Sequence, residues 1–322
     1  MSRRTTPSAN RTARLVALLT APLLLLVACG DDVSESGAAS GAEGLAAVSI
    51  TGEFGEEPKV TWEDRMTASE LESEVLIEGD GAALEEGQQV LARLWLGNGY
   101  SQSTALSTYG KDAAPELLTV GDDLSPAIAA AVQDRTLGSR VAVAAPPADA
   151  FGEGGNTQLG IGNTDSVLFI VDLIDVLPDG PSGTDAKPSS WAPAVEGDED
   201  PTGLDFEGTP EPTDKLRVTT LVEGDGEPAV KGQTVYVDYL GQVYGGKEPF
   251  DASYARGEAF SFPLGGGQVV KGWDQALEGV ATGSRILIAV PPKLGYGEAG
   301  NPDAKIKGTD TLYFVIDVLA AV

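Results

Sequence analysis

The side chains best suited to chemistry lie between residues 239 and 314, where aromatic residues alternate with a few charged ones. They are Tyr239, Phe250, Asp251, Arg256, Phe260, Trp273, Tyr296 and Phe314. The chain has no histidine, which excludes Ser-His-Asp and Cys-His nucleophilic pairs, histidine metal sites and the usual general base at neutral pH. Its acidic residues show no calcium-loop spacing. We therefore expect an apolar pocket that works without a metal, a cofactor, a nucleotide or a covalent intermediate.

Three strands and one short helix are predicted to position these side chains. Apolar residues alternate on one face of each strand and recur at i, i+3 and i+4 in the helix. The strand residues are Val235, Val237 and Tyr239, then Ile286, Ile288 and Val290, then Leu312, Phe314, Ile316 and Val318, and the helix residues are Trp273, Ala276 and Leu277. The turn Gly265-Gly266-Gly267 precedes this helix and lacks the Lys-Ser or Lys-Thr of a phosphate loop. The pattern indicates an α+β domain whose mainly antiparallel sheet shares one apolar layer with the helix.

The same domain occurs twice in the chain. Residues 71–172 and 216–317 match at a constant offset of 145, as shown by the recurrence of Glu78-Gly79-Asp80-Gly81, Gly138-Ser139-Arg140, Pro146-Pro147, Phe169 and Asp172. About a hundred residues can bury a core alone, so this period indicates a duplicated globular domain.

The segments outside the repeat differ in composition. Residues 29–47 consist mainly of Gly, Ala, Ser and acidic residues, and residues 179–213 are rich in proline, glycine and acidic residues. Both compositions favour linkers, because little apolar surface is available to offset the entropy of ordering. Residues 48–70 contain two strand-like stretches but no visible repeat. We predict a first domain at 48–178 and a second at 214–322.

The N-terminus resembles the signal of a bacterial lipoprotein. Residues 1–28 carry four arginines and no acid, and an apolar run from Leu15 ends in Leu26-Val27-Ala28 before Cys29, the only cysteine. A transmembrane anchor is the alternative, but the run is shorter than the roughly twenty residues that span a bilayer. We expect lipidation at Cys29 and location on the outer face of the bacterial cytoplasmic membrane, after export by the general route or the twin-arginine route.

The charge of the chain restricts its partners. Removing residues 1–28 lowers the formal net charge from −28 to −32. Such a polyanion is repelled by phosphate backbones and anionic headgroups. Nucleic acid is therefore excluded as a partner, and lipid chains must supply any membrane affinity.

From about Leu216 to Leu319 the chain closely resembles the FKBP-type peptidyl-prolyl isomerases, the immunophilin family. Four separated motifs occur in family order: Val237-Asp238-Tyr239-Leu240-Gly241, Phe250-Asp251 with Arg256, Val269-Val270-Lys271-Gly272-Trp273, and Tyr296-Gly297. The resemblance implies an antiparallel sheet wrapped around a short helix, in two tandem copies. It implies a proline pocket with catalytic residues Tyr239, Phe250, Asp251, Arg256, Trp273 and Tyr296 and substrate-binding residues Phe260, Val269, Val270, Ile306 and Phe314.

The resemblance also implies roles for these residues. Trp273 would form the floor of the pocket, and the Tyr296 hydroxyl and the Ile306 N–H would bond to substrate carbonyls. Isomerisation twists an amide, which becomes less charge-separated, so an apolar pocket favours the twisted state and no acid or base is required. The chain departs from the family at Asn301 and in the polar stretch 302–310, which affects substrate preference and drug affinity more than activity.

Taken singly, each aromatic residue is more often ordinary core, and Asp251 with Arg256 would be an exposed pair worth about 0–1 kcal/mol. The first copy has lost the set: Leu94, Ala105, Leu106, Lys111, Pro115, Ile128 and Phe151 replace Tyr239, Phe250, Asp251, Arg256, Phe260, Trp273 and Tyr296, while Phe169 and Ile161 are retained. We therefore expect one active pocket, in the second copy. The first would be a spacer, a docking surface or a peptide-holding module.

The expected function is isomerisation of X-Pro bonds in extracytoplasmic polypeptides, assisting folding, with possible ligands among the macrolides that bind immunophilins. A non-catalytic prolyl-peptide holdase or docking lipoprotein is the alternative, and an exported solute-binding component is a more distant one.

Overall fold

The computed structural model describes residues 41–110, 113–121 and 124–322. The predicted signal 1–28, Cys29, most of the first linker and Lys111 lie outside the described residues. Within the described ranges, no helix combines the length and the apolar character needed to cross a bilayer.

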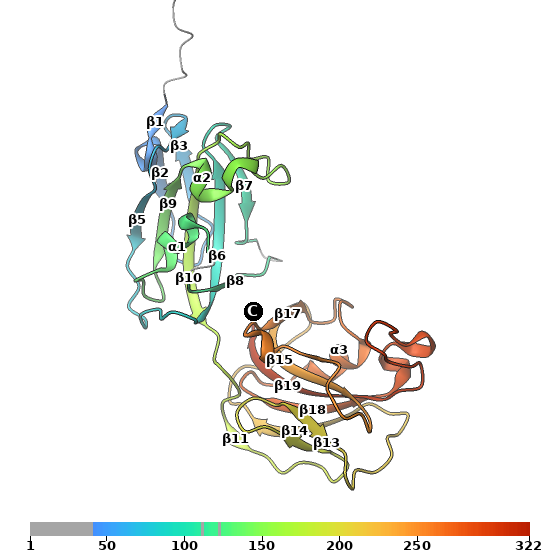
Figure 1. The fold of residues 1–322 in the computed structure, drawn as a ribbon. Coiled ribbons are helices and arrows are strands. Elements are labelled where there is room, and N and C mark those ends of the chain that lie inside the picture. The colour runs from blue at the N-terminus through green and yellow to red at the C-terminus, as the bar shows by residue number, and fades with distance from the viewer. Residues whose placement is uncertain (1–40, 111–112, 122–123) are drawn as a thin grey trace, which may run out of the picture. The chain divides into compact units, whose positions relative to one another are not determined.

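The first domain is an antiparallel sheet with a short helix against one face (Figure 1). Its strands follow the order β5-β9-β10-β6-β7, and β8 also pairs with β6. The elements are β5 (Glu72–Ile77), β6 (Gln89–Asn98), β7 (Ser103–Ser107), β8 (Glu116–Thr119), α1 (Pro126–Val132), β9 (Arg140–Ala145), α2 (Pro147–Ala150), η2 (Gly152–Gly154) and β10 (Val167–Val176). Ser125 caps α1 by accepting a hydrogen bond from the Ile128 N–H at 3.4 Å, and Pro126 lies in the first turn.

The second domain repeats this topology, with the strand order β11-β14-β18-β19-β15-β16 and β17 paired to β15. The elements are β14 (Arg217–Glu223), β15 (Thr234–Val243), β16 (Asp251–Ala252), η3 (Tyr254–Arg256), β17 (Phe260–Pro263), α3 (Lys271–Leu277), β18 (Arg285–Val290), η4 (Pro292–Leu294), η5 (Gly297–Ala299) and β19 (Leu312–Ala321). The bounds of β15, α3, β18 and β19 equal those of β6, α1, β9 and β10 shifted by 145. The predicted α+β fold in two tandem copies is confirmed.

The front face of each sheet, which carries the helix, holds the predicted apolar layer. In the second domain the alternating residues of β15, β18 and β19 join Trp273, Ala276 and Leu277 of α3 in one buried cluster. The equivalent cluster of the first domain contains Ala127 and Ala131 of α1. At the offset of 145, the main change in the helix is Ile128 in place of Trp273, while Ala131 matches Ala276.

The back face of each sheet is also covered, which the sequence patterns did not predict. In the first domain, residues 41–70 form β1 (Ala42–Glu43), η1 (Gly44–Ala47), β2 (Val48–Thr51), β3 (Lys59–Trp62) and β4 (Met66–Thr67). We call residues 41–70 the first strap. It buries Leu45, Ala47 and Met66 against Trp95 and Leu168 of the sheet.

Residues 186–215, at the same offset of 145, form the second strap. Together with β11 (Thr184–Asp185), which pairs with β14, this region contains the hairpin β12 (Ala194–Glu196) and β13 (Gly203–Asp205). Leu204 is buried and Trp191, Val195 and Phe206 pack beside it on the back face of the second sheet. The structure thus differs from the linker expectation for 179–213, and likewise for 41–47. The average composition concealed a few apolar side chains whose burial offsets the entropy of ordering.

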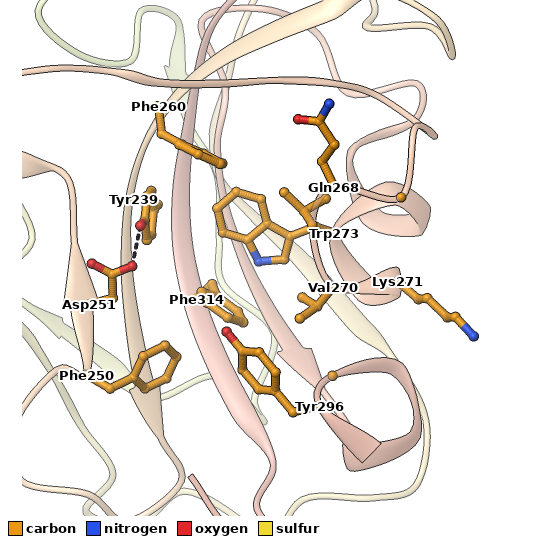
Figure 2. Close-up of a pocket in the computed structure, with 13 residues that line it drawn as sticks. Tyr239, Phe250, Asp251, Phe260, Gln268, Val270, Lys271, Trp273, Tyr296 and Phe314 are labelled. Carbon is orange, nitrogen blue, oxygen red and sulfur yellow. Dashed lines mark hydrogen bonds between the residues drawn. The ribbon is translucent and has the colours of Figure 1, made fainter. Parts of the chain in front are cut away.

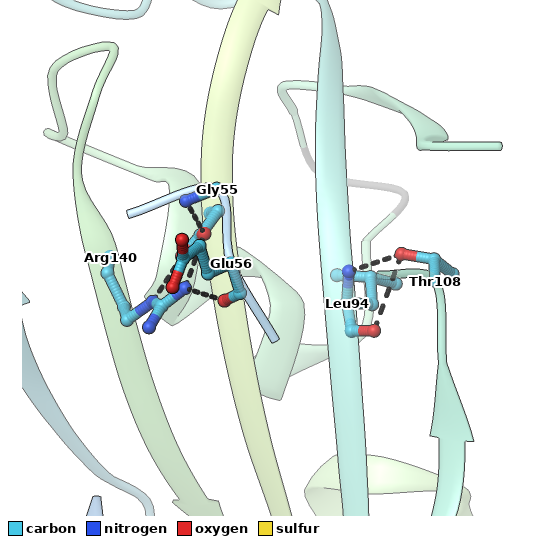
Figure 3. A network of polar contacts seen from close by, with 6 residues as sticks. Gly55, Glu56, Leu94, Thr108 and Arg140 are labelled. Atoms are coloured by element: carbon cyan, nitrogen blue, oxygen red, sulfur yellow. Dashed lines mark hydrogen bonds and ion pairs between the residues drawn. The ribbon is translucent and has the colours of Figure 1, made fainter. Parts of the chain in front are cut away.

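A buried ion pair fastens each strap to its sheet. Asp172 accepts two hydrogen bonds from Arg140, at 2.6 and 2.7 Å, and a third from the Gly55 N–H at 2.8 Å, while Arg140 donates to the Glu56 carbonyl at 2.6 Å (Figure 3). In the second domain, Arg285 bonds to Asp317 at 2.6 and 2.7 Å and to the strap carbonyl of Glu199 at 2.8 Å. The recurring Arg and Asp of the repeat therefore hold the strap in both copies.

Candidate active site

A cavity of about 600 Å³ opens on the front face of the second domain. It is lined by thirteen residues from β15, β16, β17, the entry to α3, the turn after η4 and β19 (Figure 2). Nine of the eleven predicted site residues are among them: Tyr239, Phe250, Asp251, Phe260, Val269, Val270, Trp273, Tyr296 and Phe314. The tertiary structure thus brings together residues that are up to 75 positions apart in the chain.

Trp273 forms the base of the cavity, with 3% of its surface exposed. Its ring meets the rings of Tyr239 and Phe314 edge to face, each with a centroid distance of 5.2 Å. Phe250 packs edge to face on Phe314 at 5.7 Å. This packing requires Gly241, because a Cβ there would lie 2.7 Å from the Phe250 ring. The result is an aromatic wall of a kind that suits a compact, apolar ring such as that of proline.

The polar side of the cavity is one hydrogen-bonded group. The Tyr239 hydroxyl donates to Asp251 Oδ2, Arg256 Nη1 bonds to Asp251 Oδ1 at 2.8 Å, and Arg256 Nη2 donates to the Tyr239 hydroxyl at 3.2 Å. Arg256 itself is not among the residues that line the cavity. It acts by holding Asp251 and Tyr239.

This arrangement sets the charge of the group. Burial opposes ionisation of Asp251, but the hydrogen bonds from Tyr239 and Arg256 outweigh it and lower the pKa of the carboxyl below its ordinary value. Burial, followed by the bond to Asp251, raises the pKa of Tyr239 to about 12. The cavity therefore presents a carboxylate beside a protonated phenol throughout the neutral range.

Two further hydrogen-bond donors belong to residues that line the cavity. Tyr296 is 39% exposed, and its hydroxyl points back into the pocket (Figure 2). Val270 precedes α3, and its N–H makes no hydrogen bond to any described residue. Sequence reasoning counted Val270 only as a wall of the pocket, since the freedom of a backbone N–H is not visible in a residue type.

Ile306 corrects one prediction. Its side chain is buried in the core, with 4% of its surface exposed, and it does not line the cavity. Its N–H donates to the Asn301 carbonyl at 2.9 Å, and its carbonyl accepts from the Asn301 N–H at 2.8 Å. This reciprocal pair closes the polar loop that follows Tyr296, so the Ile306 N–H is not available to a substrate carbonyl as the resemblance implied.

Four lining residues were not predicted: Gly267, Gln268, Lys271 and Gly295. Gln268 and Lys271 immediately flank the Val269-Val270 pair, and Gly295 precedes Tyr296. Their adjacency to the motif residues was the available signal.

The same positions in the first domain hold packed apolar side chains. Leu94 is buried, and Ala105, Leu106 and Ile128 pack against the core of that domain. Phe151, which replaces Tyr296, stacks on Phe169 with a centroid distance of 6.2 Å. The first domain therefore lacks the carboxylate and the two phenolic hydroxyls of the second at every described counterpart.

Comparisons with known proteins agree with the second domain. Residues 225–319 match the family model described as FKBP-type peptidyl-prolyl cis-trans isomerase. A "FK506-binding protein" of Streptomyces anulatus is 44% identical over 117 residues, which is 36% of this chain and 94% of that protein.

The "Peptidyl-prolyl cis-trans isomerase FKBP15-2" of Arabidopsis thaliana is 47% identical over 92 residues, 29% of this chain and 55% of that protein. The chain thus spans about half the length of that relative. Among solved structures, FkpA from Escherichia coli is 37% identical over 33% of this chain and 47% of its own, with a TM-score of 0.30.

Proposed function

Because this chain belongs to the FKBP-type peptidyl-prolyl cis-trans isomerases, we propose that it has one active pocket, in the second domain, that isomerises X-Pro bonds. The observation that carries this proposal is the bonded group of Tyr239, Asp251 and Arg256 beside an aromatic cavity based on Trp273. The first domain, with apolar side chains at these positions, serves as a non-catalytic module.

The proposed mechanism is selective stabilisation of a twisted amide. Rotation about an X-Pro bond crosses a barrier of about 18–20 kcal/mol because amide resonance is lost. The twisted amide is less charge-separated than the planar one, so an apolar and water-poor cavity favours it. The wall around Trp273 holds the proline ring while the bond rotates. No covalent bond forms or breaks, so the chain needs no general base.

The polar groups orient the chain on either side of the proline. In this proposal the Tyr296 hydroxyl and the Val270 N–H, both on residues that line the cavity, donate to the flanking carbonyls, which keeps the peptide still while one bond turns. The Asp251 carboxylate, held by Tyr239 and Arg256, interacts with the carbonyl of the rotating amide. Macrolide ligands of immunophilins would occupy this same cavity and compete with the peptide.

We further propose that the chain acts outside the cytoplasm as a lipoprotein anchored through Cys29 and assists the folding of secreted proteins. The support is the sequence of residues 1–29 and the slowness of uncatalysed isomerisation, which takes tens of seconds or more. The test is fractionation of cells that express the full chain or its Cys29→Ser variant. Membrane association that persists in the variant would contradict lipid anchoring.

The test of the proposed activity is turnover of a short X-Pro peptide by the mature chain. Trp273→Ala and Asp251→Leu should each lower kcat/KM by about tenfold or more, since each removes a group that acts on the twisted state. The matched control is Ile128→Ala, at the position of Trp273 in the first domain, which should leave kcat/KM within about twofold. Circular dichroism checks that each variant is folded.

Two results would contradict the proposal. Equal losses in Trp273→Ala and Ile128→Ala would show that the pocket is not confined to the second domain. Peptide binding without any acceleration of isomerisation would support the holdase instead.

A further inference from the structure

The segment 251–256 carries two members of the bonded group, Asp251 and Arg256, yet both are open to solvent. Their side chains are 46% and 49% exposed. An exposed ion pair of this kind contributes only about 0–1 kcal/mol. The pair therefore cannot hold its own geometry, and the backbone between its two members must be held by other contacts.

The first of these contacts is Ser253, which is fully buried. Its hydroxyl donates to Asp238 Oδ1 at 2.6 Å and accepts from the Tyr239 N–H at 2.8 Å. Its own N–H donates to the Tyr239 carbonyl at 2.9 Å. Ser253 thus ties the segment to the backbone of the pocket tyrosine.

The second contact is Tyr254, which reaches to the opposite face of the sheet. Its ring packs in the cluster beneath the second strap, and its hydroxyl donates to Asp317 Oδ2 at 3.0 Å. Asp317 is fully buried and is the partner of Arg285, which in turn bonds to the strap carbonyl of Glu199. Burial raises the pKa of Tyr254 far above its ordinary value, so the hydroxyl remains a donor. The Tyr254 side chain thus connects segment 251–256, which carries the pocket carboxylate of Asp251, to the Arg285–Asp317 ion pair on the back face of the sheet.

The first domain keeps the same parts without this bond. Tyr109, Arg140 and Asp172 occupy the positions of Tyr254, Arg285 and Asp317. Thr108 replaces Ser253 and still accepts from the Leu94 N–H at 2.8 Å (Figure 3). The buried Tyr109 hydroxyl makes no hydrogen bond of ordinary length in the described part of the chain, but it lies close enough to Asp172 and Arg140 for both to act on its pKa. The 3.0 Å tyrosine–aspartate bond is formed in the second copy, which has a pocket carboxylate to position, whereas the first copy holds the equivalent groups near one another without it.

We propose that Tyr254 is a positioning residue for the isomerase site, holding segment 251–256 so that Asp251 and Arg256 meet the Tyr239 hydroxyl. This inference rests on the proposed function. Tyr254 touches no substrate. It acts through Asp251, because the bond from its hydroxyl to Asp317 sets the path of η3, which connects the carboxylate to the arginine.

The test compares three removals of a single hydroxyl in the mature chain. Tyr254→Phe should lower kcat about threefold to tenfold with KM within about twofold, because the carboxylate acts on the rotating bond more than on the bound peptide. The first control is Tyr244→Phe, whose hydroxyl donates to the strap carbonyl of Thr209 at 3.2 Å on the same face. The second is Tyr109→Phe in the first domain. Both controls should keep kcat within about twofold at a temperature where all three variants are folded.

A double-mutant cycle separates positioning from general loosening. If Tyr254 acts through Asp251, then Tyr254→Phe should have almost no further effect in the Asp251→Leu chain. Equal kcat losses in Tyr254→Phe and Tyr244→Phe, or an undiminished loss in the Asp251→Leu background, would overturn the inference while leaving the proposed function intact. An inactive wild-type chain would overturn both.

Discussion

The two domains share one scaffold and differ in one pocket. Apart from the edge strand β11 of the second sheet, both have the same strand order, and both have a strap on the back face and an Arg–Asp pair that bonds to a strap carbonyl. They differ on the front face, where Tyr239, Asp251 and Trp273 stand in place of Leu94, Leu106 and Ile128. The residues that maintain this fold are therefore separate from the residues that form the cavity. A domain can therefore lose the cavity and keep its core.

Both domains share an Arg–Asp ion pair on the back face of the sheet, so breaking this pair should lower the stability of both domains by a similar amount. Asp172→Asn and Asp317→Asn each leave a buried arginine without its countercharge, which should cost about 3–5 kcal/mol of unfolding free energy. Calorimetry of the mature chain, with the two domain transitions resolved, measures this. Isomerase activity at low temperature should fall only in Asp317→Asn. A cost below about 1 kcal/mol in either variant would show that the pair does not hold its domain.

The buried side chains of the straps should contribute a smaller amount to the unfolding free energy, again similar in the two domains. Leu204→Ala in the second strap and Leu45→Ala in the first each remove a buried side chain from a back-face cluster. Each should lower the unfolding free energy by about 2–4 kcal/mol. Chemical denaturation followed by tryptophan fluorescence reports the change, since Trp191 and Trp95 lie in the respective clusters. If the straps were linkers, as composition suggests, both variants would match the wild type.

The smallest expected effect is that of pH, and it concerns only the second domain. The pKa of Asp251 is lowered and that of Tyr239 is raised to about 12, so neither group changes charge near neutrality. We expect kcat/KM to be flat between about pH 5 and pH 9, as the lack of histidine also favours. The ionised Asp251 contributes to the stability of the folded domain at pH values above its unfolded pKa of about 3.9. This contribution to stability disappears as the pH falls through the lower pKa of the folded state. A bell-shaped profile centred near pH 7 would instead reveal a group in the site, other than Asp251 and Tyr239, that titrates near neutrality.

Much of the front face could be predicted from the sequence. Alternation identified Val235, Val237 and Tyr239 as one face of a strand, and the spacing of Trp273, Ala276 and Leu277 identified the helix that covers it. The pocket residues were predicted from the resemblance of four ordered motifs to the FKBP-type isomerases, and the offset of 145 then predicted that the first copy lacks them. Only Ile306 was assigned a role that its hydrogen bond to Asn301 excludes.

The back face could not be predicted in the same way. Tyr313, Leu287 and Leu240 lie on the strand faces that point away from the helix, and they are buried because Leu204 and Phe206 cover them. A period of two shows which side chains share a face, but it does not show what will lie on that face. The second strap places Trp191, Val195, Leu204 and Phe206 on this face, and their irregular spacing in a polar segment shows no period.

By itself, the sequence determined the duplication, the α+β fold of each copy and the front-face core, since these follow from local spacing and from comparison across the offset of 145, and its family motifs identified nine of the residues at the pocket. Only the tertiary structure decided that the acidic, proline-rich segments cover the sheets, that the Val270 N–H is free while that of Ile306 is bonded, and that the hydroxyl of Tyr254 reaches Asp317. The physical reason is that burial and hydrogen bonding depend on distances between segments far apart in the chain, which no local pattern of residue types records.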